Sequence, residues 1–242
     1  MKDERPTKSE IAEPVRVNLL KLVVQTAVTQ LVLGLALFLP AGTLRWPAGW
    51  IFIGLMLGIS VGESAWLIRY NPGLMNERMS GLGRKDQEPW DKTLITITAI
   101  VFVAWLALMG LDAVRFHWSR MPPAVQALGG LIFLASFRIF HATFRENTFL
   151  SPAVRIQTDR AHTVVSTGPY ARVRHPMYGG FVLFAVGAPL LLGSWYGVLG
   201  ALVLIGIVAR RAVLEERMLR ERLPGYSDYA AKVRYRFVPG IW

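Results

Sequence analysis

Long apolar blocks alternate with short polar segments along most of the 242-residue chain. The first four blocks occupy residues 17–39, 46–70, 93–111 and 122–144. A bilayer core of about 30 Å requires about 20 mostly apolar helical residues for each crossing, and each block offers about this length. We therefore predict four transmembrane helices over 17–144, after a polar N-terminal segment at 1–16.

Two shorter apolar runs follow at residues 178–192 and 195–209, and only Gly193-Ser194 separates them. Such a short connection predicts a tight helical hairpin. At about 1.5 Å rise per residue, each arm barely reaches across a bilayer. The second arm continues as a charged helix as far as Pro224. The pattern thus predicts an all-α polytopic membrane protein with about six transmembrane helices, the last two forming a hairpin that continues into a cytoplasmic C-terminal helix.

The charge distribution sets the expected orientation. With the N-terminus in the cytoplasm, most Lys and Arg lie on the cytoplasmic side, in residues 1–16, 69–92, 145–177 and 210–242. The outer turns then hold only Arg45, Arg115 and Arg120. The positive-inside rule favours this arrangement, with both termini cytoplasmic, and we take the membrane to be a bacterial inner membrane.

The composition excludes several classes of protein. The hydrophobic fraction is 53%, and the formal net charge of +11 comes from basic residues between the apolar blocks. Such residues meet anionic membrane lipids, and no zinc-finger spacing or basic helix face predicts a nucleic-acid partner. The chain has no cysteine, and its four histidines have no zinc-type spacing, so we predict no metal.

A polar segment with the sequence S-T-G-P-Y-A-R-V-R-H-P-M-Y-G-G, residues 166–180, leads into the first hairpin arm. Its Gly-Pro and His-Pro pairs predict turns, because proline fixes its own φ and disfavours helix at the preceding residue. Arginine, histidine and tyrosine side chains are therefore presented from a short irregular segment. Such a composition is also typical of a basic juxtamembrane loop with interfacial tyrosines.

Two adjacent carboxylates, Glu215 and Glu216, follow the second arm. Because the arms are antiparallel, we expect them to meet the Arg-His-Tyr segment at one cytoplasmic rim. Acidic groups suit the ammonium and ribose hydroxyls of a zwitterionic cofactor, and basic groups suit its carboxylate. The i,i+4 spacing of Arg211 and Glu215 is equally typical of a salt-bridged solvent helix.

Several ionisable residues lie inside the apolar blocks. A charged side chain such as Glu63 is costly to place at that depth in the membrane unless it is paired or faces a cavity. Glu63 is therefore either a functional candidate or a structural partner of a basic residue such as Arg69. Arg138 and His141 are three residues apart and share a helix face.

The motif G-P-Y-A-R-V-R-H-P-M-Y-G-G, followed by E-E-R, L-P-G-Y-S-D-Y and R-Y-R-F-V-P-G-I-W, resembles the isoprenylcysteine carboxyl methyltransferase and phospholipid methyltransferase superfamily. The resemblance covers roughly residues 162–242 and implies an integral membrane enzyme that uses S-adenosyl-L-methionine. It implies a cofactor-binding core over 145–242, with cofactor contacts from Gln157, His162, Gly168, Tyr170, Arg174, His175, Pro176, Tyr178, Glu215 and Glu216.

The candidates for the catalytic step are His175, Arg211 and Glu216. The sulfonium is already activated, so the protein must supply in-line positioning and a water-poor site. A carboxylate acceptor needs no general base, whereas an amine or hydroxyl must lose a proton. His175 is therefore either that base or a cofactor ligand. Arg210 and Arg211 are candidates to orient an acidic acceptor, and Tyr226 and Tyr229 to cover the pocket.

The predicted function is methyl transfer to a lipophilic acceptor, the carboxylate or amine of a prenylated or lipid-like molecule that arrives from the bilayer. No obligate protein partner is inferred. Two alternatives stay open. One is an NADPH-dependent membrane reductase of sterol-reductase-like architecture, which the paired carboxylates disfavour because they would repel a nucleotide phosphate. The other is a non-catalytic membrane binding module.

The orientation can be tested with reporter fusions. Fusions after Arg84 and after Ala161 should report the cytoplasm, and a fusion at Arg115 the outside, because the basic segments remain inside. A reporter at Ala161 that faces the outside would contradict both the topology and the expected site.

Overall fold

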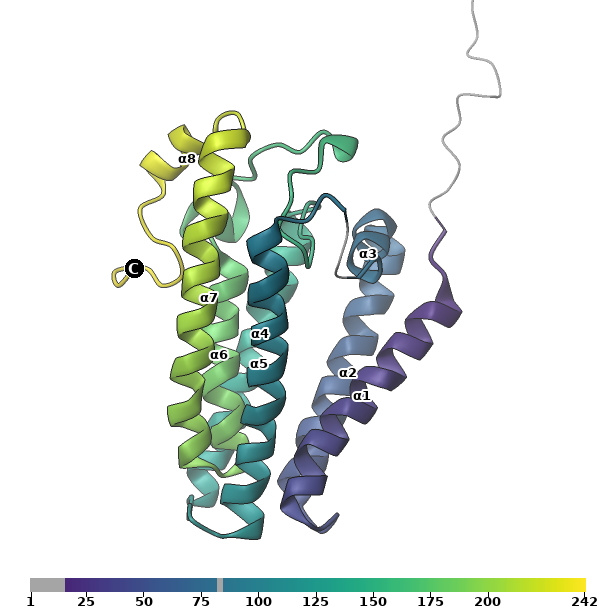
Figure 1. Cartoon of the computed structure of the whole chain (residues 1–242), viewed down its shortest axis with the longest axis vertical. Helices are drawn as coiled ribbons and strands as arrows, with labels where there is room; N and C mark the ends of the chain where they lie inside the picture. The colour runs from purple at the N-terminus through teal and green to yellow at the C-terminus, as the bar shows by residue number, and fades with distance from the viewer. Residues whose placement is uncertain (1–15, 82–84) are drawn as a thin grey trace, which may run out of the picture.

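The computed structural model describes residues 16–81 and 85–242, and nearly all of its regular structure is helical (Figure 1). The N-terminal half contains α1 (Leu19–Ala41), α2 (Pro47–Tyr70), α3 (Pro72–Met79), α4 (Pro89–Gly110), the π-helical turn η1 (Leu111–Arg115) and α5 (Pro123–Glu146). The C-terminal half contains the 3-10 turns η2 (Thr158–Arg160) and η3 (Gly168–Ala171), then α6 (Pro176–Leu192), α7 (Trp195–Arg222) and α8 (Tyr226–Lys232). The predicted all-α fold is confirmed. The predicted segment 1–16 lies almost wholly outside the described residues.

Five helices are long and apolar enough to cross a membrane: α1, α2, α4 with η1, α5 and α7. The sixth apolar helix, α6, has 17 residues. The polytopic membrane architecture is confirmed, and the number of crossings stays a prediction. The first helix differs slightly from its predicted bounds, since α1 continues through Pro40 and ends where Gly42 adopts a left-handed conformation with φ 72°.

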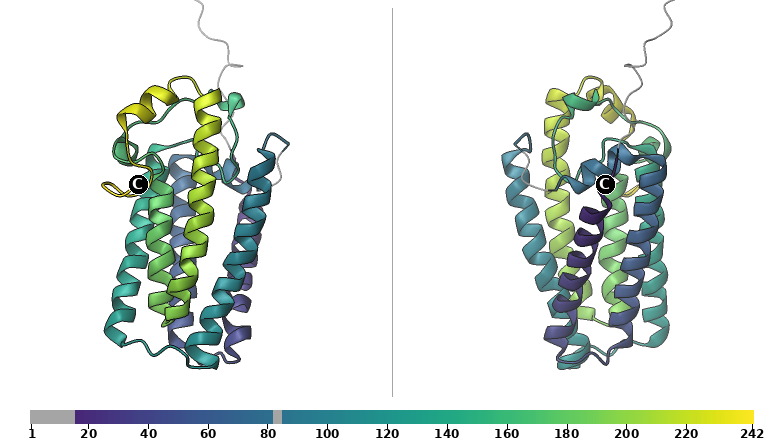
Figure 2. Two further views of the ribbon diagram at one scale, coloured as in Figure 1. Left: turned by 60° about the vertical axis from the view of Figure 1, so that its left-hand side comes forward. Right: turned by 90° about the vertical axis from the view of Figure 1, so that its right-hand side faces the viewer.

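The helices form one bundle around an apolar core (Figures 1 and 2). Helix α5 packs along α6, α7 packs against α6 and α4, and α1 packs against α4 and α2. The fully buried side chains of this core include Leu37, Phe52, Leu106, Met109, Phe133 and Leu204. Figure 2 shows that α7 extends beyond the neighbouring helices and leads into α8.

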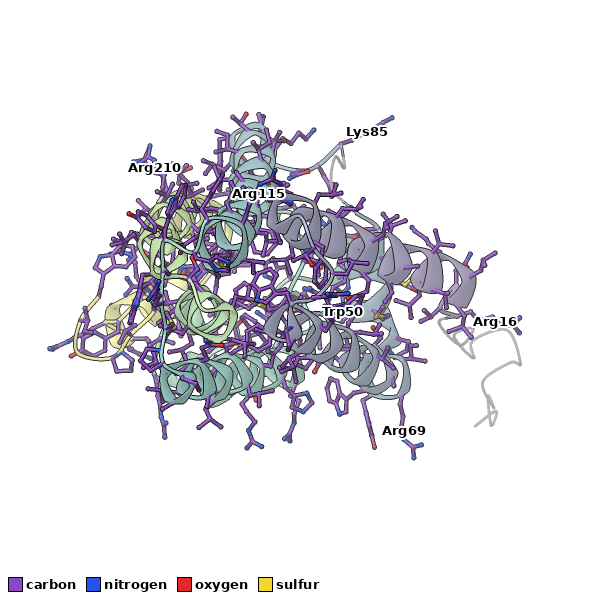
Figure 3. The ribbon with its side chains drawn as sticks, turned by 90° about the horizontal axis from the view of Figure 1, so that it is seen from below. Arg16, Trp50, Arg69, Lys85, Arg115 and Arg210 are labelled. Carbon is purple, nitrogen blue, oxygen red and sulfur yellow. The ribbon has the colours of Figure 1, made fainter. Side chains whose placement is uncertain are left out.

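The outer surface of the bundle is strongly apolar. Exposed residues include Leu20, Val23, Leu31, Ile100, Leu131, Leu199 and Leu202. A soluble protein rarely exposes so much apolar surface, whereas a bilayer solvates it. In the view from below, Arg69, Lys85 and Arg210 point away from the bundle (Figure 3). Arg210 is therefore not placed to orient an acceptor inside it.

Glycines bring α5 and α6 into close contact. A Cβ atom added at Gly187 would lie 2.5 Å from the Phe133 backbone nitrogen, and one added at Gly129 would lie 2.4 Å from the Leu190 Cβ. Small residues allow such close approach between membrane helices. This packing matters for the site because α6 begins there.

The two ends of the bundle differ in chemistry. The lower end in Figure 1 holds short connections between helices. Two of these connections are joined by the buried Asp112, which accepts hydrogen bonds from Ser119 Oγ at 2.7 Å and Ser194 Oγ at 2.5 Å. The upper end holds α3, α8 and the connector at residues 147–175. Most of the long polar segments therefore meet at one end.

The α5–α6 contact can be tested by adding a single methyl group. Gly187→Ala should destabilise the protein by about 1–3 kcal/mol, because the neighbouring atoms are backbone and the helices must separate. Gly206→Ala is the matched control in α7, since nothing lies within 4 Å of its added Cβ. The measurement is thermal unfolding in detergent. Equal midpoints for the two variants would contradict the close contact.

Candidate active site

A cavity of about 290 Å³ lies at the upper end of the bundle. Its wall is built by the connector, the beginning of α6, the C-terminal part of α7, α8 and one residue of α3. Of the residues predicted from the sequence, those that line it are Gln157, His162, Tyr170, Arg174, His175, Tyr178, Arg211 and Glu215. The volume is close to that of the smaller sites that bind small molecules. The expected meeting of the connector and the hairpin is thus observed.

The C-terminal segment holds the residues that precede α6 in place. The backbone N–H groups of Arg174 and His175 donate to the carbonyls of Tyr235, at 2.9 Å, and Arg236, at 2.8 Å. Pro176 then begins α6, where its missing N–H costs nothing because the first helical N–H groups have no partner within the helix. Both side chains consequently start from a fixed backbone.

Glu216 lies behind the cavity wall rather than in it. Its side chain is 3% exposed, and its Oε1 accepts from Arg174 Nε at 2.7 Å. His175 Nε2 and Arg236 Nε each lie 3.2 Å from the same oxygen. Glu216 is not among the described residues that line the cavity. Its predicted cofactor contact stays a prediction, and the observed contacts instead make it a support for Arg174 and His175.

Glu215 faces the cavity, with its side chain 24% exposed. Its Oε2 accepts a hydrogen bond from the Tyr178 hydroxyl at 2.7 Å and lies 3.9 Å from His175 Nδ1. The rings of His175 and Tyr178 stack with centroids 5.3 Å apart. Because Nε2 faces Glu216, Nδ1 is the ring nitrogen of His175 on the Glu215 side.

Arg211 does not form the expected i,i+4 ion pair with Glu215. Its Nε instead donates to Asp91 Oδ1 at 2.7 Å. Its other nitrogens donate to the Tyr178 hydroxyl at 3.1 Å and the Pro152 carbonyl at 2.8 Å. A fully buried carboxylate such as Asp91 needs a cationic partner, and this requirement outweighs the weak pairing along the helix.

Asp91 was not predicted from the sequence as a site residue. It lies in the first turn of α4, and its Oδ2 accepts from Gln87 Nε2 and from the Val154 N–H, both at 2.8 Å. It therefore joins α4, the connector and α7 beside the cavity. The only signal in the sequence was a charged residue just before an apolar block, which is ordinary at a membrane boundary.

A second unpredicted network holds the connector. Arg155 is buried and bonds Glu77 of α3 at 3.1 Å and Asp86 and Asp159 at 2.8 Å each. Burial lowers the pKa of Arg155, but its hydrogen bonds to Asp159 and Glu77 outweigh this effect and raise the pKa above its usual value. The guanidinium thus stays charged and ties α3 to the connector.

The aqueous side of the cavity carries aromatic and polar groups of the connector. Gln157 Nε2 donates to the Phe149 carbonyl at 2.5 Å, and its Oε1 accepts from Arg160 at 2.7 Å, so its amide is largely used within the protein. The ring of His162 lies 4.6 Å from that of Phe149. Burial lowers the pKa of His162, although Glu215 opposes the effect, which favours a neutral imidazole at pH 7.

Buried tyrosines complete this side of the wall. The Tyr170 hydroxyl accepts from Asn147 Nδ2 at 2.8 Å, and the Tyr229 hydroxyl donates to the Tyr170 carbonyl at 2.8 Å. Burial raises the pKa of Tyr170, Tyr226 and Tyr229, so all three are neutral donors. Tyr226 and Tyr229 line the cavity from α8, in the place expected of a cover.

Gly168 and Pro176 are not brought to this cavity. They line a separate apolar depression on the outer face of α5 and α6, beside Phe237. Gly168 has φ 56°, and an added Cβ would lie 2.6 Å from Glu146 Oε2, so the position requires glycine for its backbone. The two residues shape the segment, and their predicted cofactor contacts are not supported by this arrangement.

The ionisable residues inside the apolar blocks also have identifiable places. Glu63 Oε2 pairs with His141 Nδ1 at 3.0 Å rather than with Arg69. Trp66 lies edge-on to the His141 ring at 5.0 Å. The pair connects α2 and α5 near the α3 side of the upper end.

Fold and cavity together define a polytopic helical membrane protein with a polar pocket at one end of its bundle. The family described as phospholipid methyltransferase matches residues 124–224. This match confirms the resemblance to the isoprenylcysteine carboxyl methyltransferase and phospholipid methyltransferase superfamily that the motifs predict. It includes α5, the connector and the α6–α7 hairpin.

Curated relatives show the same resemblance. The chain is 32% identical over 106 residues to a protein-S-isoprenylcysteine O-methyltransferase of Schizosaccharomyces pombe, covering 43% of this chain and 45% of the relative. It is 34% identical over 82 residues to a probable enzyme of the same name from Oryza sativa subsp. indica, covering 33% and 43%. The chain thus matches less than half the length of these relatives.

The structure of the eukaryotic intramembrane Ras methyltransferase ICMT superposes with a TM-score of 0.54 at 19% identity, covering 91% of this chain and 77% of that one. This similarity extends beyond the matched segment to nearly the whole helical bundle. It supports the same fold for the N-terminal helices.

The two carboxylates should respond differently to substitution. Glu215→Gln should weaken binding of S-adenosylhomocysteine about ten- to a hundredfold with little change in thermal stability, because a charge-assisted bond from the cavity wall is lost. Glu216→Gln should instead lower the stability by about 3–5 kcal/mol, because a buried ion pair is broken. Calorimetric titration and thermal unfolding measure the two effects. Unchanged cofactor affinity in Glu215→Gln would remove this residue from the binding site.

Proposed function

We propose that this chain is an integral membrane methyltransferase that uses S-adenosyl-L-methionine and methylates a lipophilic acceptor at the membrane boundary. The observation that carries the proposal is the Glu215 carboxylate in the cavity wall. Its Oε2 is held by Tyr178, while within the described part of the chain its Oε1 has no hydrogen-bond partner. The names of the matched relatives support the same class of reaction.

The residues around the cavity fit this cofactor chemically. The free oxygen of Glu215 is an acceptor for ammonium or ribose hydroxyl groups, and the rings of His162, Tyr170 and Tyr226 offer an aromatic wall. Gln157 is largely used within the protein and is better suited to shaping the wall. When bound, the cofactor supplies a methyl group already activated on its sulfonium.

The protein itself would contribute orientation, exclusion of water and, where needed, a proton acceptor. Tyr226 and Tyr229 of α8 cover the aqueous side, which favours a water-poor site. Arg211 donates to the hydroxyl of Tyr178 and thereby fixes the group that holds Glu215. His175 has Nε2 directed to Glu216, so Nδ1 is the nitrogen that would take a proton from an amine or hydroxyl acceptor.

The acceptor would reach the cavity from the bilayer. Leu150, Met177 and Met218 contribute an apolar part of the wall, suited to a prenyl or acyl chain near the reacting group. The basic segments at this end of the bundle favour a cytoplasmic site, in an inner membrane if the source is bacterial. The proposed acceptor is a prenylated or lipid-like carboxylate or amine. Membrane lipids are the partner that solvates its apolar chain.

The proposal is tested by titrating the purified protein with S-adenosylhomocysteine and, separately, with NADPH. Binding of S-adenosylhomocysteine alone is expected, because the carboxylate of Glu215 in the cavity wall accepts ammonium or hydroxyl groups and would repel a nucleotide phosphate. Transfer of labelled methyl groups to extracted membrane lipids should accompany it. Binding of NADPH alone would favour a reductase, and cofactor binding without transfer to any lipid would favour a binding module.

A further inference from the structure

Four arginines line the cavity: Arg78, Arg155, Arg174 and Arg211. Three of them are held by the protein. Arg155 bonds three carboxylates, and Arg211 bonds Asp91, Tyr178 and Pro152. Arg174 bonds Glu216 and donates to the carbonyls of Val233, at 2.6 Å, and Arg234, at 2.9 Å. Their donors are largely consumed, so these three cations are poorly placed to bind a ligand.

Arg78 is different. Among residues 16–81 and 85–242 its guanidinium makes no hydrogen bond and no ion pair, and it lies over the Phe144 ring at 4.4 Å from the centroid. A guanidinium carries five N–H donors, and enclosing them without acceptors is unfavourable. Burial lowers the pKa of Arg78 to about 10, against an opposing effect of Glu63, so the group is still a cation at pH 7.

Glu63 does not satisfy this cation. Its Oε2 is engaged by His141, and its buried Oε1 has no hydrogen-bond partner within the described residues. The structure gives no ion pair between these two described residues, although each attracts the other. Arg78 is partly buried and lines the cavity, so a ligand in the cavity can supply the acceptor that the described residues do not.

The position of Arg78 separates two parts of the cavity. Helices α3 and α8 lie on opposite sides of the upper end (Figure 1). Tyr226 and Tyr229 belong to the α8 side, whereas the wall beside α3 and the beginning of α6 contains Arg78, Leu150 and Met177. One side is polar and aromatic, and on the other side Arg78 lies near apolar side chains that suit a lipid chain.

We infer that Arg78 binds an anionic group, a carboxylate or a phosphate, on the lipophilic acceptor. This inference rests on the proposed function for the identity of the ligand as the acceptor. The guanidinium lies over the Phe144 ring, and its N–H groups form a planar fork that matches two oxygens of such a group. Arg78 then distinguishes anionic from neutral acceptors.

The test measures binding of paired probes to the full-length protein in detergent with saturating S-adenosylhomocysteine. One pair is N-acetyl-S-farnesylcysteine and its carboxamide, and the other is dodecyl phosphate and dodecanol. In the wild type, the anionic member of at least one pair should bind about ten- to a hundredfold more tightly. The pair that shows this preference identifies the anion as carboxylate or phosphate.

Arg78→Gln should abolish the preference, and Arg78→Lys should retain part of it, since lysine keeps the charge but loses the fork. Arg145→Gln is the matched control, because this exposed arginine lies beside Phe144 but does not line the cavity. It should keep the full preference. Affinity for S-adenosylhomocysteine and the unfolding midpoint should stay unchanged in Arg78→Gln.

Three results would overturn the inference. The first is equal binding of anionic and neutral probes by the wild type, which needs no variant. The second is an undiminished preference in Arg78→Gln. The third is a parallel loss of stability and cofactor affinity in both Arg78 variants, which would make Arg78 a structural counter-ion of Glu63. If the wild type does not bind S-adenosylhomocysteine, the proposed function is refuted instead. The binding of the anionic and neutral probes can still be compared in that case.

Discussion

The arrangement of the upper end depends on one buried carboxylate, that of Glu216. It gathers Arg174 and His175 from the segment before α6 and Arg236 from the C-terminal segment around a single oxygen. The buried charges of Glu216 and Arg174 would each be costly alone, and together they satisfy one another, while the partly exposed Arg236 adds a further positive charge. Two parts of the chain that are distant in sequence are thereby fixed against α7, and the cavity wall takes its shape from their positions.

The same principle recurs around the cavity. Asp91 is fully buried and engages Arg211, and Arg155 is enclosed by carboxylates from α3 and the connector. These contacts leave the irregular connector few ways to move, even though it has little regular structure of its own. Among the cavity-lining arginines of the described chain, Arg78 departs from this pattern, and the departure is what indicates a ligand.

The sequence was sufficient for the fold class and for much of the site. The length of the apolar blocks predicted the helices, because a bilayer requires about 20 apolar residues per helical crossing and satisfied backbone hydrogen bonds. The antiparallel hairpin predicted that the segment before α6 would meet Glu215 and Glu216, and Tyr178 does bond Glu215. What the sequence could not predict was which carboxylate faces the cavity, since adjacent helical residues point about 100° apart and only packing decides between them.

The ion pairs across the molecule were equally inaccessible. The i,i+4 pattern placed Arg211 with Glu215, but a buried Asp91 more than a hundred residues earlier is the stronger partner. Similarly, Glu63 pairs with His141 and not with Arg69 on its own helix. An i,i+4 ion pair stabilises a helix by roughly a few tenths of a kcal/mol, whereas breaking a buried ion pair costs several times more. Burial therefore determines which partners are chosen.

The support that residues 235–237 give to Arg174 and His175 also orders events during synthesis. The hydrogen-bonding carbonyls of Tyr235 and Arg236 follow every apolar helix of the described residues in the sequence, so they are synthesised after those helices. The bundle can therefore insert and begin to pack while the pocket is still incomplete. The backbone of Arg174 and His175 is fixed only when residues 235–237 fold back against it, so the wall of the pocket is completed after the transmembrane helices have been made.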